Sequence, residues 1–259
     1  MNERSAPDAA PALELSGLSK RFGETVAVDA VDLVVPQSSF FGLVGPNGAG
    51  KTTALSMAVG LLRPDAGSAR ILGLEVWADP ERAKAAVGVL PDALMLPERL
   101  TGLELLTYVG LLRGLATELV AERAQELLAV LDLDDAGDTL VIEYSAGMRK
   151  KIGLAAALLH APRLLVLDEP FEAVDPVSAS TIRTILRRMV DAGGTIIFSS
   201  HVMALVELLC THVAVISSGH VLAAGTVDEV RGDGTLDDAF VRLVGAEVGG
   251  AEGLAWLAS

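Results

Sequence analysis

The sequence predicts an α/β fold with a mostly parallel sheet and helices on both faces. Short, largely apolar runs at 164–167, 195–199 and 213–216 alternate with segments of helical spacing, the pattern of strands buried on both faces. An earlier apolar run, 40–44, ends in a glycine-rich segment followed by another helical pattern. Functional residues are expected at the carboxyl ends of these strands, where ligands bind in such sheets.

The first third of the chain reads as a leader followed by short strands. Residues 1–12 are rich in Ala and Pro and lack periodicity, which predicts a loose leader. Short β-type runs follow at 13–15 and 26–35, and Pro36 ends the second. Helical spacing over 52–62 and a strand candidate at 87–90 complete this part.

The middle of the chain changes to helical periodicity. Apolar residues recur at helical spacing over 103–112 and 120–131, and a third helix is predicted from Ala146 to His160, stopped by Pro162. We therefore expect a helical insert at 92–161. After it, helices over 176–190 and from about 202 alternate with the strands named above, and a last strand is expected at 221–223.

The composition is apolar, but it predicts no membrane span. The chain has 259 residues, of which 51% are hydrophobic, and a mean hydropathy of +0.47. A spanning helix needs about 20 consecutive apolar residues, and the longest uncharged stretch, 208–227, is interrupted by His212, Ser217 and Gly219. No secretory signal is recognised at the N-terminus, so we expect a cytoplasmic protein. The single cysteine, Cys210, is expected to be a small buried apolar residue.

The charge argues against nonspecific nucleic-acid binding. Twenty Lys and Arg face 34 Asp and Glu, which gives a formal charge of -14, whereas binding to a phosphate backbone requires a basic face. The acidic excess is concentrated in 117–143, where Arg123 is the only basic residue, and in 226–259. The rest of the chain is nearly neutral, so the overall charge does not exclude a local phosphate site.

The glycine-rich segment after the 40–44 strand fits the GxxxxGK[ST] phosphate loop. Its residues are Gly45, Pro46, Asn47, Gly48, Ala49, Gly50, Lys51 and Thr52. Glycines let the backbone N–H groups turn inward as an anion nest, and the following helix directs its positive end at the phosphates. Lys51 can then reach the β- and γ-phosphates of a nucleotide, Thr52 can ligate Mg²⁺, and Thr53 can donate toward the α-phosphate.

A pair of carboxylates ends the 164–167 strand. An isolated acidic pair commonly marks a strand end that meets solvent. With a phosphate loop upstream, however, Asp168 is expected to hold the Mg²⁺ and Glu169 to orient or deprotonate the attacking water. Because adjacent side chains of an extended chain point to opposite sides, the strand itself is expected to separate these two roles.

One further motif identifies a family. Tyr144-Ser145-Ala146-Gly147-Met148-Arg149-Lys150 resembles the signature motif of ATP-binding cassette (ABC) transporter ATPases, in a form common in bacterial exporter subunits. From the residues alone, the segment is a helix capped by Ser145. The resemblance extends from about 13 to 245, and it implies a phosphate-loop NTPase core, a small antiparallel β subdomain and the inserted helical subdomain.

The resemblance also assigns roles to single residues. It implies that Ser145 and Gly147 bind the γ-phosphate held by a second cassette in a head-to-tail dimer. Phe22 stands where the family has an aromatic ring that stacks on adenine; the alternative is that it is an aromatic residue of the core. Asp175 matches a loop that crosses the dimer interface, and otherwise it caps the helix begun by Pro176. His201 matches a histidine that contacts the γ-phosphate.

The sequence departs from the family at Asp92, where the family normally has a Gln that reaches the Mg²⁺ and the attacking water. Asp92 can serve as an oxygen ligand, but it adds a negative charge and cannot donate hydrogen bonds. Because Lys51, Asp168, Glu169 and His201 are all present, we expect altered coupling rather than an inactive site.

The resemblance implies an ATPase with ATP and Mg²⁺ as cofactors. It also implies that two cassettes, expected to form a homodimer, bind ATP and thereby power export through a separate multispanning permease. The permease is expected to meet an apolar segment at 92–110, which otherwise is core of the insert. The protein would then lie on the inner face of the cell membrane. The alternative is a soluble regulatory or hydrolysis-deficient ABC protein, and a small-molecule kinase would not explain residues 144–150 or His201.

These expectations divide the chain into four parts. They are a leader at 1–12, an ATP-binding core at 13–91 and 162–231, the helical subdomain at 92–161, and a C-terminal extension at 232–259.

Overall fold

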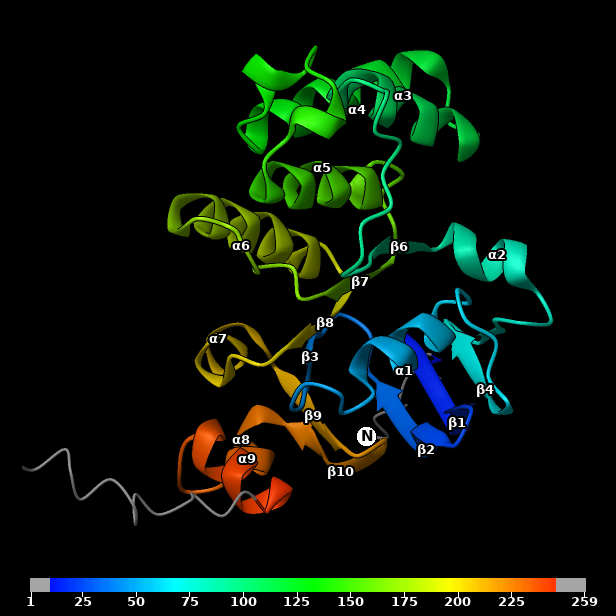
Figure 1. The fold of residues 1–259 in the computed structure, drawn as a ribbon, viewed down its shortest axis with the longest axis vertical. Coiled ribbons are helices and arrows are strands. Elements are labelled where there is room, and N and C mark those ends of the chain that lie inside the picture. The colour runs from blue at the N-terminus through cyan, green and yellow to red at the C-terminus, as the bar shows by residue number, and fades with distance from the viewer. Residues whose placement is uncertain (1–9, 246–259) are drawn as a thin grey trace, which may run out of the picture.

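The computed structural model describes residues 10–245 and shows two sheets and a group of helices (Figure 1). The larger sheet has six strands in the order β10-β9-β3-β8-β7-β6. Neighbours from β9 to β6 run parallel, and β10 is antiparallel to β9. Its strands are β3 (Phe40–Val44), β6 (Val87–Leu90), β7 (Leu164–Asp168), β8 (Thr195–Ser200), β9 (His212–Ser217) and β10 (His220–Thr226).

The smaller sheet is antiparallel and has the order β2-β1-β4-β5. Its strands are β1 (Leu13–Phe22), β2 (Thr25–Val35), β4 (Ala66–Ile71) and β5 (Leu74–Glu75). The parallel sheet and the small antiparallel sheet confirm the predicted fold class. Strands β4 and β5 were not predicted from the sequence, because the segment 66–75 contains two glycines and lacks an alternating apolar pattern.

Three helices and two 3₁₀ turns lie between β6 and β7, at the top of Figure 1. They are α3 (Gly102–Leu112), α4 (Thr117–Val130), η1 (Asp134–Ala136), η2 (Val141–Glu143) and α5 (Ala146–Leu158). Thr101 and Glu104 form a capping box at the start of α3, which satisfies two backbone donors. The remaining helices are α1 (Lys51–Ala58), α2 (Pro80–Ala85), α6 (Pro176–Asp191), α7 (Met203–Leu209), α8 (Val227–Arg231) and α9 (Leu236–Val244).

The parallel sheet separates two hydrophobic cores. Along β7, Leu165 and Leu167 face the core shared with the helices of the insert, whereas Leu164 and Val166 face the core shared with α1 and the small sheet. All five residues of β7 are buried, which explains why such strands read as continuous apolar runs. Helix α1 contacts strands of both sheets, so the loop before it is held on two sides.

The chain ends differ from the sequence analysis at one point. Of the predicted leader, residues 1–9 lie outside the described residues, but Ala12 is fully buried and its N–H donates to Val35 O at 2.9 Å. The expectation of a loose segment is therefore wrong at Ala12, which belongs to the small sheet's core. Of the C-terminal extension, 246–259 lie outside the described residues, and 236–244 form α9.

No helix between residues 10 and 245 combines the length and the apolar character needed to cross a bilayer. Cys210 is partly buried and packs against the core shared with the helices of the insert, and burial raises the pKa of its thiol well above the usual value.

Candidate functional site

The phosphate loop connects β3 to α1 at the carboxyl edge of the parallel sheet. Its tight path requires glycine at two positions. Gly50, the N-cap of α1, has φ of 101°, and a Cβ there would lie 2.4 Å from Ala27 O. A Cβ at Gly45 would lie 2.2 Å from Ile216 O. No side chain caps α1, so its first N–H groups are available to an anion.

Lys51 is buried and points along the loop toward the acidic pair. Its Nζ donates to Gly45 O at 2.7 Å and to Pro46 O at 3.3 Å, and it lies 4.0 Å from Glu169 Oε1. The ammonium is therefore held on loop carbonyls next to the place where phosphate charge would lie. This geometry suits a residue that changes partners when an anion enters.

The two carboxylates of the acidic pair are separated by a backbone turn. Asp168 is the last residue of β7 and is buried, whereas Glu169 has left the strand with φ of 46°. The expectation that strand alternation separates the two side chains is therefore wrong, because Glu169 adopts a left-handed conformation that is rare for a residue with a Cβ.

Ser199 on β8 connects the carboxylate of Asp168 to the backbone of Glu169. Its Oγ donates to Asp168 Oδ1 and accepts from the backbone N–H of Glu169 at 3.0 Å. Ser199 is fully buried, so both bonds form away from water, where an unmade bond would be costly. Ser199 was not among the site residues predicted from the sequence. A serine at the end of the otherwise apolar strand 195–199, at the carboxyl edge of the sheet where ligands bind, is the sequence feature that could have indicated it.

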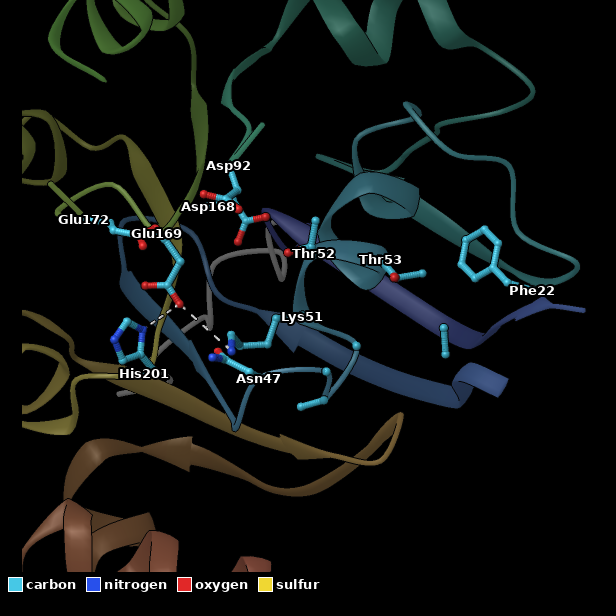
Figure 2. A pocket seen from close by; sticks show the side chains of 14 residues that line it. Phe22, Asn47, Lys51, Thr52, Thr53, Asp92, Asp168, Glu169, Glu172 and His201 are labelled. Atoms are coloured by element: carbon cyan, nitrogen blue, oxygen red, sulfur yellow. Dashed lines mark hydrogen bonds and ion pairs between the residues drawn. The ribbon is translucent and has the colours of Figure 1, made fainter. Parts of the chain in front are cut away.

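A histidine completes the acidic end of the site. His201 Nδ1 lies 3.1 Å from Glu169 Oε1. Figure 2 shows His201 and Lys51 approaching Glu169 from two sides, with dashed lines to both. Glu169 thus faces a cation on the phosphate loop and an imidazole after β8, an arrangement that can orient one carboxylate oxygen.

These residues line a pocket of about 560 Å³. It brings together most of the predicted site: Phe22, Asn47, Gly48, Ala49, Gly50, Lys51, Thr52, Thr53, Asp92, Asp168, Glu169 and His201. Ala27 and Glu172 also line it and were not predicted. Phe22 is 51% exposed and lies away from the carboxylates in Figure 2, beyond Thr53, so it is not a core aromatic.

The carboxylates of Asp92, Asp168, Glu169 and Glu172 make this wall of the pocket acidic. Among residues 10–245, no three His, Cys, Asp or Glu side chains are close enough together to hold a metal by themselves. Carboxylate and hydroxyl oxygens are hard ligands that suit Mg²⁺, which usually keeps waters and binds substrate phosphates. The residues therefore fit a metal that enters with a triphosphate.

Five predicted residues lie outside the lining of the pocket: Gly45 and Pro46 at the start of the phosphate loop, and Ser145, Gly147 and Asp175. Ser145 caps α5, because its Oγ accepts from Met148 N–H at 3.2 Å. A Cβ at Gly147 would lie 3.1 Å from Ala173 O, which places the start of α5 against the loop after Glu169. Asp175 caps α6, and hydrogen bonds from Ser178 and Val177 hold the pKa of its carboxyl below the usual value.

Comparisons with known proteins agree with this geometry. A sequence model of the family described as "ABC transporter" matches residues 28–172. The daunorubicin/doxorubicin resistance ATP-binding protein DrrA of Streptomyces peucetius is 40% identical over 220 residues, which cover 85% of this chain and 67% of that protein. The Nod factor export ATP-binding protein I of Cupriavidus metallidurans is 37% identical over 218 residues, covering 84% and 72%.

A solved structure is also similar. The structure described as an ATP-binding subunit of an ABC transporter has a TM-score of 0.84 and 29% sequence identity, and the match covers 90% of this chain and 99% of that one.

Proposed function

Because the chain belongs to the ABC transporter family, we propose that it binds and hydrolyses ATP to power export through a separate membrane permease. The proposal rests mainly on the position of Glu169, which lies between Lys51 of the phosphate loop and His201. The alternative, a hydrolysis-deficient or regulatory ABC protein, would not need a carboxylate held in this way.

In this proposal the triphosphate of ATP lies on the loop 45–52. The N–H groups of Asn47, Gly48, Ala49 and Gly50 and the start of α1 bind its oxygens. Lys51 leaves the carbonyls of Gly45 and Pro46 for the β- and γ-phosphates, and Thr53 donates on the α-phosphate side. Phe22 stacks on the adenine, which its exposed position at the far side of the pocket allows.

Thr52 and Asp168 would hold Mg²⁺, with Asp92 as a further oxygen ligand. When bound, Mg²⁺ neutralises phosphate charge and orients the β- and γ-phosphates. Ser199 fixes one oxygen of Asp168 by its hydrogen bond. This leaves the other oxygen of the carboxylate for the metal or a water bound to it.

Glu169 acts as the general base in hydrolysis. It accepts a proton from the attacking water, and its position is set by Lys51 on one side and His201 on the other. His201 is half exposed at the rim of the pocket, where its free ring nitrogen can reach a γ-phosphate.

Two cassettes form the working unit, and we propose a homodimer. Ser145 and Gly147 lie off the pocket of their own chain, so they are available to the ATP held by a second copy. Asp175 caps α6 and follows Ala173, whose carbonyl lies against Gly147, by two residues. Because the start of α5 carries free N–H groups beyond the Ser145 cap, it provides a second helix N-terminus for the γ-phosphate.

The permease partner is proposed to dock on the segment 92–110, on the inner face of the membrane. Met95 is 94% exposed, whereas Leu94, Leu96, Leu100 and Leu103 pack partly against the core. Most apolar residues of the segment are thus buried or partly buried in the helical subdomain proposed at 92–161, and Met95 and Tyr108, the latter 49% exposed, are its large exposed members. The names of the two relatives, which refer to resistance and export, support export as the direction.

The test compares the ATPase rate of the purified protein with that of Glu169→Gln. We expect Mg²⁺-dependent hydrolysis in the wild type and its loss in the variant, which accumulates an ATP-bound dimer visible by light scattering. Glu14→Gln, whose carboxylate faces Arg70 at 3.5 Å in the small sheet, is the control and keeps the wild-type rate. Equal rates in the wild type and Glu169→Gln would overturn the assignment of the base.

A further inference from the structure

Lys150 on α5 is a buried cation that the proposed chemistry has not used. Its side chain is only 10% exposed. Its Nζ lies 3.3 Å from Asp92 Oδ1 and donates to the backbone oxygen of Asp168 at 3.4 Å. A buried ammonium is costly without a countercharge, and within the described part of the chain Asp92 is the only carboxylate that lies within 4.0 Å of it.

Asp92, in turn, is a carboxylate that needs a cation beside it. It follows β6 and its carboxylate is half exposed at the pocket that binds the triphosphate in our proposal. An unpaired negative charge there would repel phosphate oxygens. The neighbouring Asp168, Glu169 and Glu172 already make this wall of the pocket acidic, so the carboxylate of Asp92 would add to that repulsion. Lys51 approaches the wall at Glu169, and it does not contact Asp92.

We propose that Lys150 is a positioning residue of the ATPase site. Its ammonium neutralises Asp92 and holds one oxygen of that carboxylate, so that the rest of the carboxylate stays at the pocket in a defined orientation. Through the carbonyl of Asp168, the same ammonium also ties α5 to the end of β7. This inference rests on the proposed function, because it concerns the site in which ATP is hydrolysed.

Lys150 contacts both the carboxylate of Asp92 and the backbone at the end of β7. A purely structural role, in packing α5 against β7, therefore has to be separated from an effect through Asp92. The separation is possible with a double-mutant cycle, which measures whether the effect of one residue depends on the other. A packing role predicts the same loss from Lys150→Gln whether or not Asp92 is charged. A role through Asp92 predicts a loss only when the carboxylate is present.

The experiment compares the wild type, Lys150→Gln, Asp92→Asn and the double variant, each as the full chain. We measure kcat, the KM for ATP and the Mg²⁺ concentration that gives half the maximal rate. Lys150→Gln is expected to lower kcat/KM about tenfold and to raise the Mg²⁺ requirement. In the Asp92→Asn background the same change is expected to cost no more than about twofold.

Two further variants act as controls. Lys150→Arg keeps the charge and is expected to restore most of the rate. Lys151→Gln removes the next lysine of α5, which is equally buried but faces Asp132 at 3.8 Å, away from the pocket, and it is expected to leave the rate unchanged. Should Lys150→Gln fail to fold, Lys150→Met, which keeps the apolar stem, replaces it in the cycle.

The proposal is overturned if Lys150→Gln causes the same loss in both backgrounds, or if Lys151→Gln reduces the rate as much as Lys150→Gln. Failure of the proposed function would show differently, as a wild type that does not hydrolyse ATP. In that case the affinity for Mg²⁺·ATP is measured on the same four proteins. Lys150→Gln must then weaken binding only where Asp92 is present, and an equal weakening in both backgrounds overturns the inference.

Discussion

His201 Nδ1 lies 3.1 Å from Glu169 Oε1, so the imidazole and the proposed general base share a direct contact before any substrate is considered. The histidine directly follows β8 and the glutamate directly follows β7, and these two strands are neighbours in the parallel sheet. Parallel pairing therefore brings together two residues that are 32 positions apart in the sequence.

The first prediction concerns this contact. His201→Ala should lower kcat about tenfold to a hundredfold, because Glu169 loses one of the two groups that orient it. The affinity for ATP should change less than kcat, since the phosphate loop is intact and only the contact of the imidazole with the γ-phosphate is lost. His220→Ala is a matched control: His220 is 53% exposed, against 54% for His201, and it faces Asp29 at 3.7 Å. If both variants lose the same activity, the contact with Glu169 has no specific role.

The second prediction concerns Ser199. Ser199→Ala removes the hydroxyl that contacts Asp168 and the backbone N–H of Glu169, which leaves two buried polar groups without this partner. We expect a loss of about 1–3 kcal/mol in the free energy of unfolding and a raised Mg²⁺ concentration for half-maximal ATPase rate. Chemical denaturation and a Mg²⁺ titration measure the two effects.

The neighbouring serine separates a general strand effect from a specific one. Ser200 is equally buried, but its Oγ accepts from Val202 N–H and contacts neither carboxylate. Ser200→Ala should therefore leave the Mg²⁺ requirement unchanged, and Ser199→Thr, which keeps a hydroxyl, should restore it. A Mg²⁺ requirement that stays at the wild-type value in Ser199→Ala would refute the role of the hydroxyl in holding Asp168.

How far the site could be predicted depends on the range of its contacts. The phosphate loop is local: Lys51 meets the carbonyls of residues five and six positions earlier, so a sequence pattern captures it. Lys150 and Asp92 are 58 positions apart, and nothing local indicates that they meet. Ser199 reads as part of an apolar strand, and only the pairing of β7 with β8 places its hydroxyl at Asp168.

The fold shows the same division. The strands of the parallel sheet were predictable because burial on both faces makes them continuously apolar. Strand β4, with the sequence Ala-Gly-Ser-Ala-Arg-Ile, has only weak β-propensity and is held by pairing with β1. Tertiary pairing therefore decides its structure, and local preference does not.

The third prediction tests the glycine at the start of α1. Gly50→Ala places a Cβ 2.4 Å from Ala27 O at φ of 101°, so the loop must move. We expect the affinity for ATP, measured by calorimetric titration, to fall at least about tenfold, together with a strain cost of about 1–3 kcal/mol. Gly114→Ala is the control. Gly114 also has a positive φ, of 73°, but a Cβ there would meet open space between α3 and α4. Equal affinities in the two variants would contradict the requirement for close approach at Gly50.

The fourth prediction concerns the dependence of stability on pH. His160, two residues after α5 ends, is partly buried, and its Nδ1 has no partner within the described residues. Burial, and secondarily the charge of Arg113, lower the pKa of His160 from 6.5 to about 4. The folded state therefore prefers the neutral ring, whereas the unfolded chain takes up a proton below about pH 6.5.

The stabilisation from the neutral ring is thus complete above pH 6.5 and is lost as the pH falls toward about 4. Between pH 7 and 4.5 the loss should be about 1–2 kcal/mol, after allowance for the partial exposure of the ring. His160→Gln does not titrate, and its amide can still donate to Val87 O, the acceptor that Nε2 faces at 3.1 Å. Urea unfolding at both pH values should therefore show a smaller acid-induced loss in the variant than in the wild type. Parallel losses in the two proteins would mean that His160 stays uncharged or unlinked to folding over this range, and that carboxylates elsewhere account for the acid sensitivity.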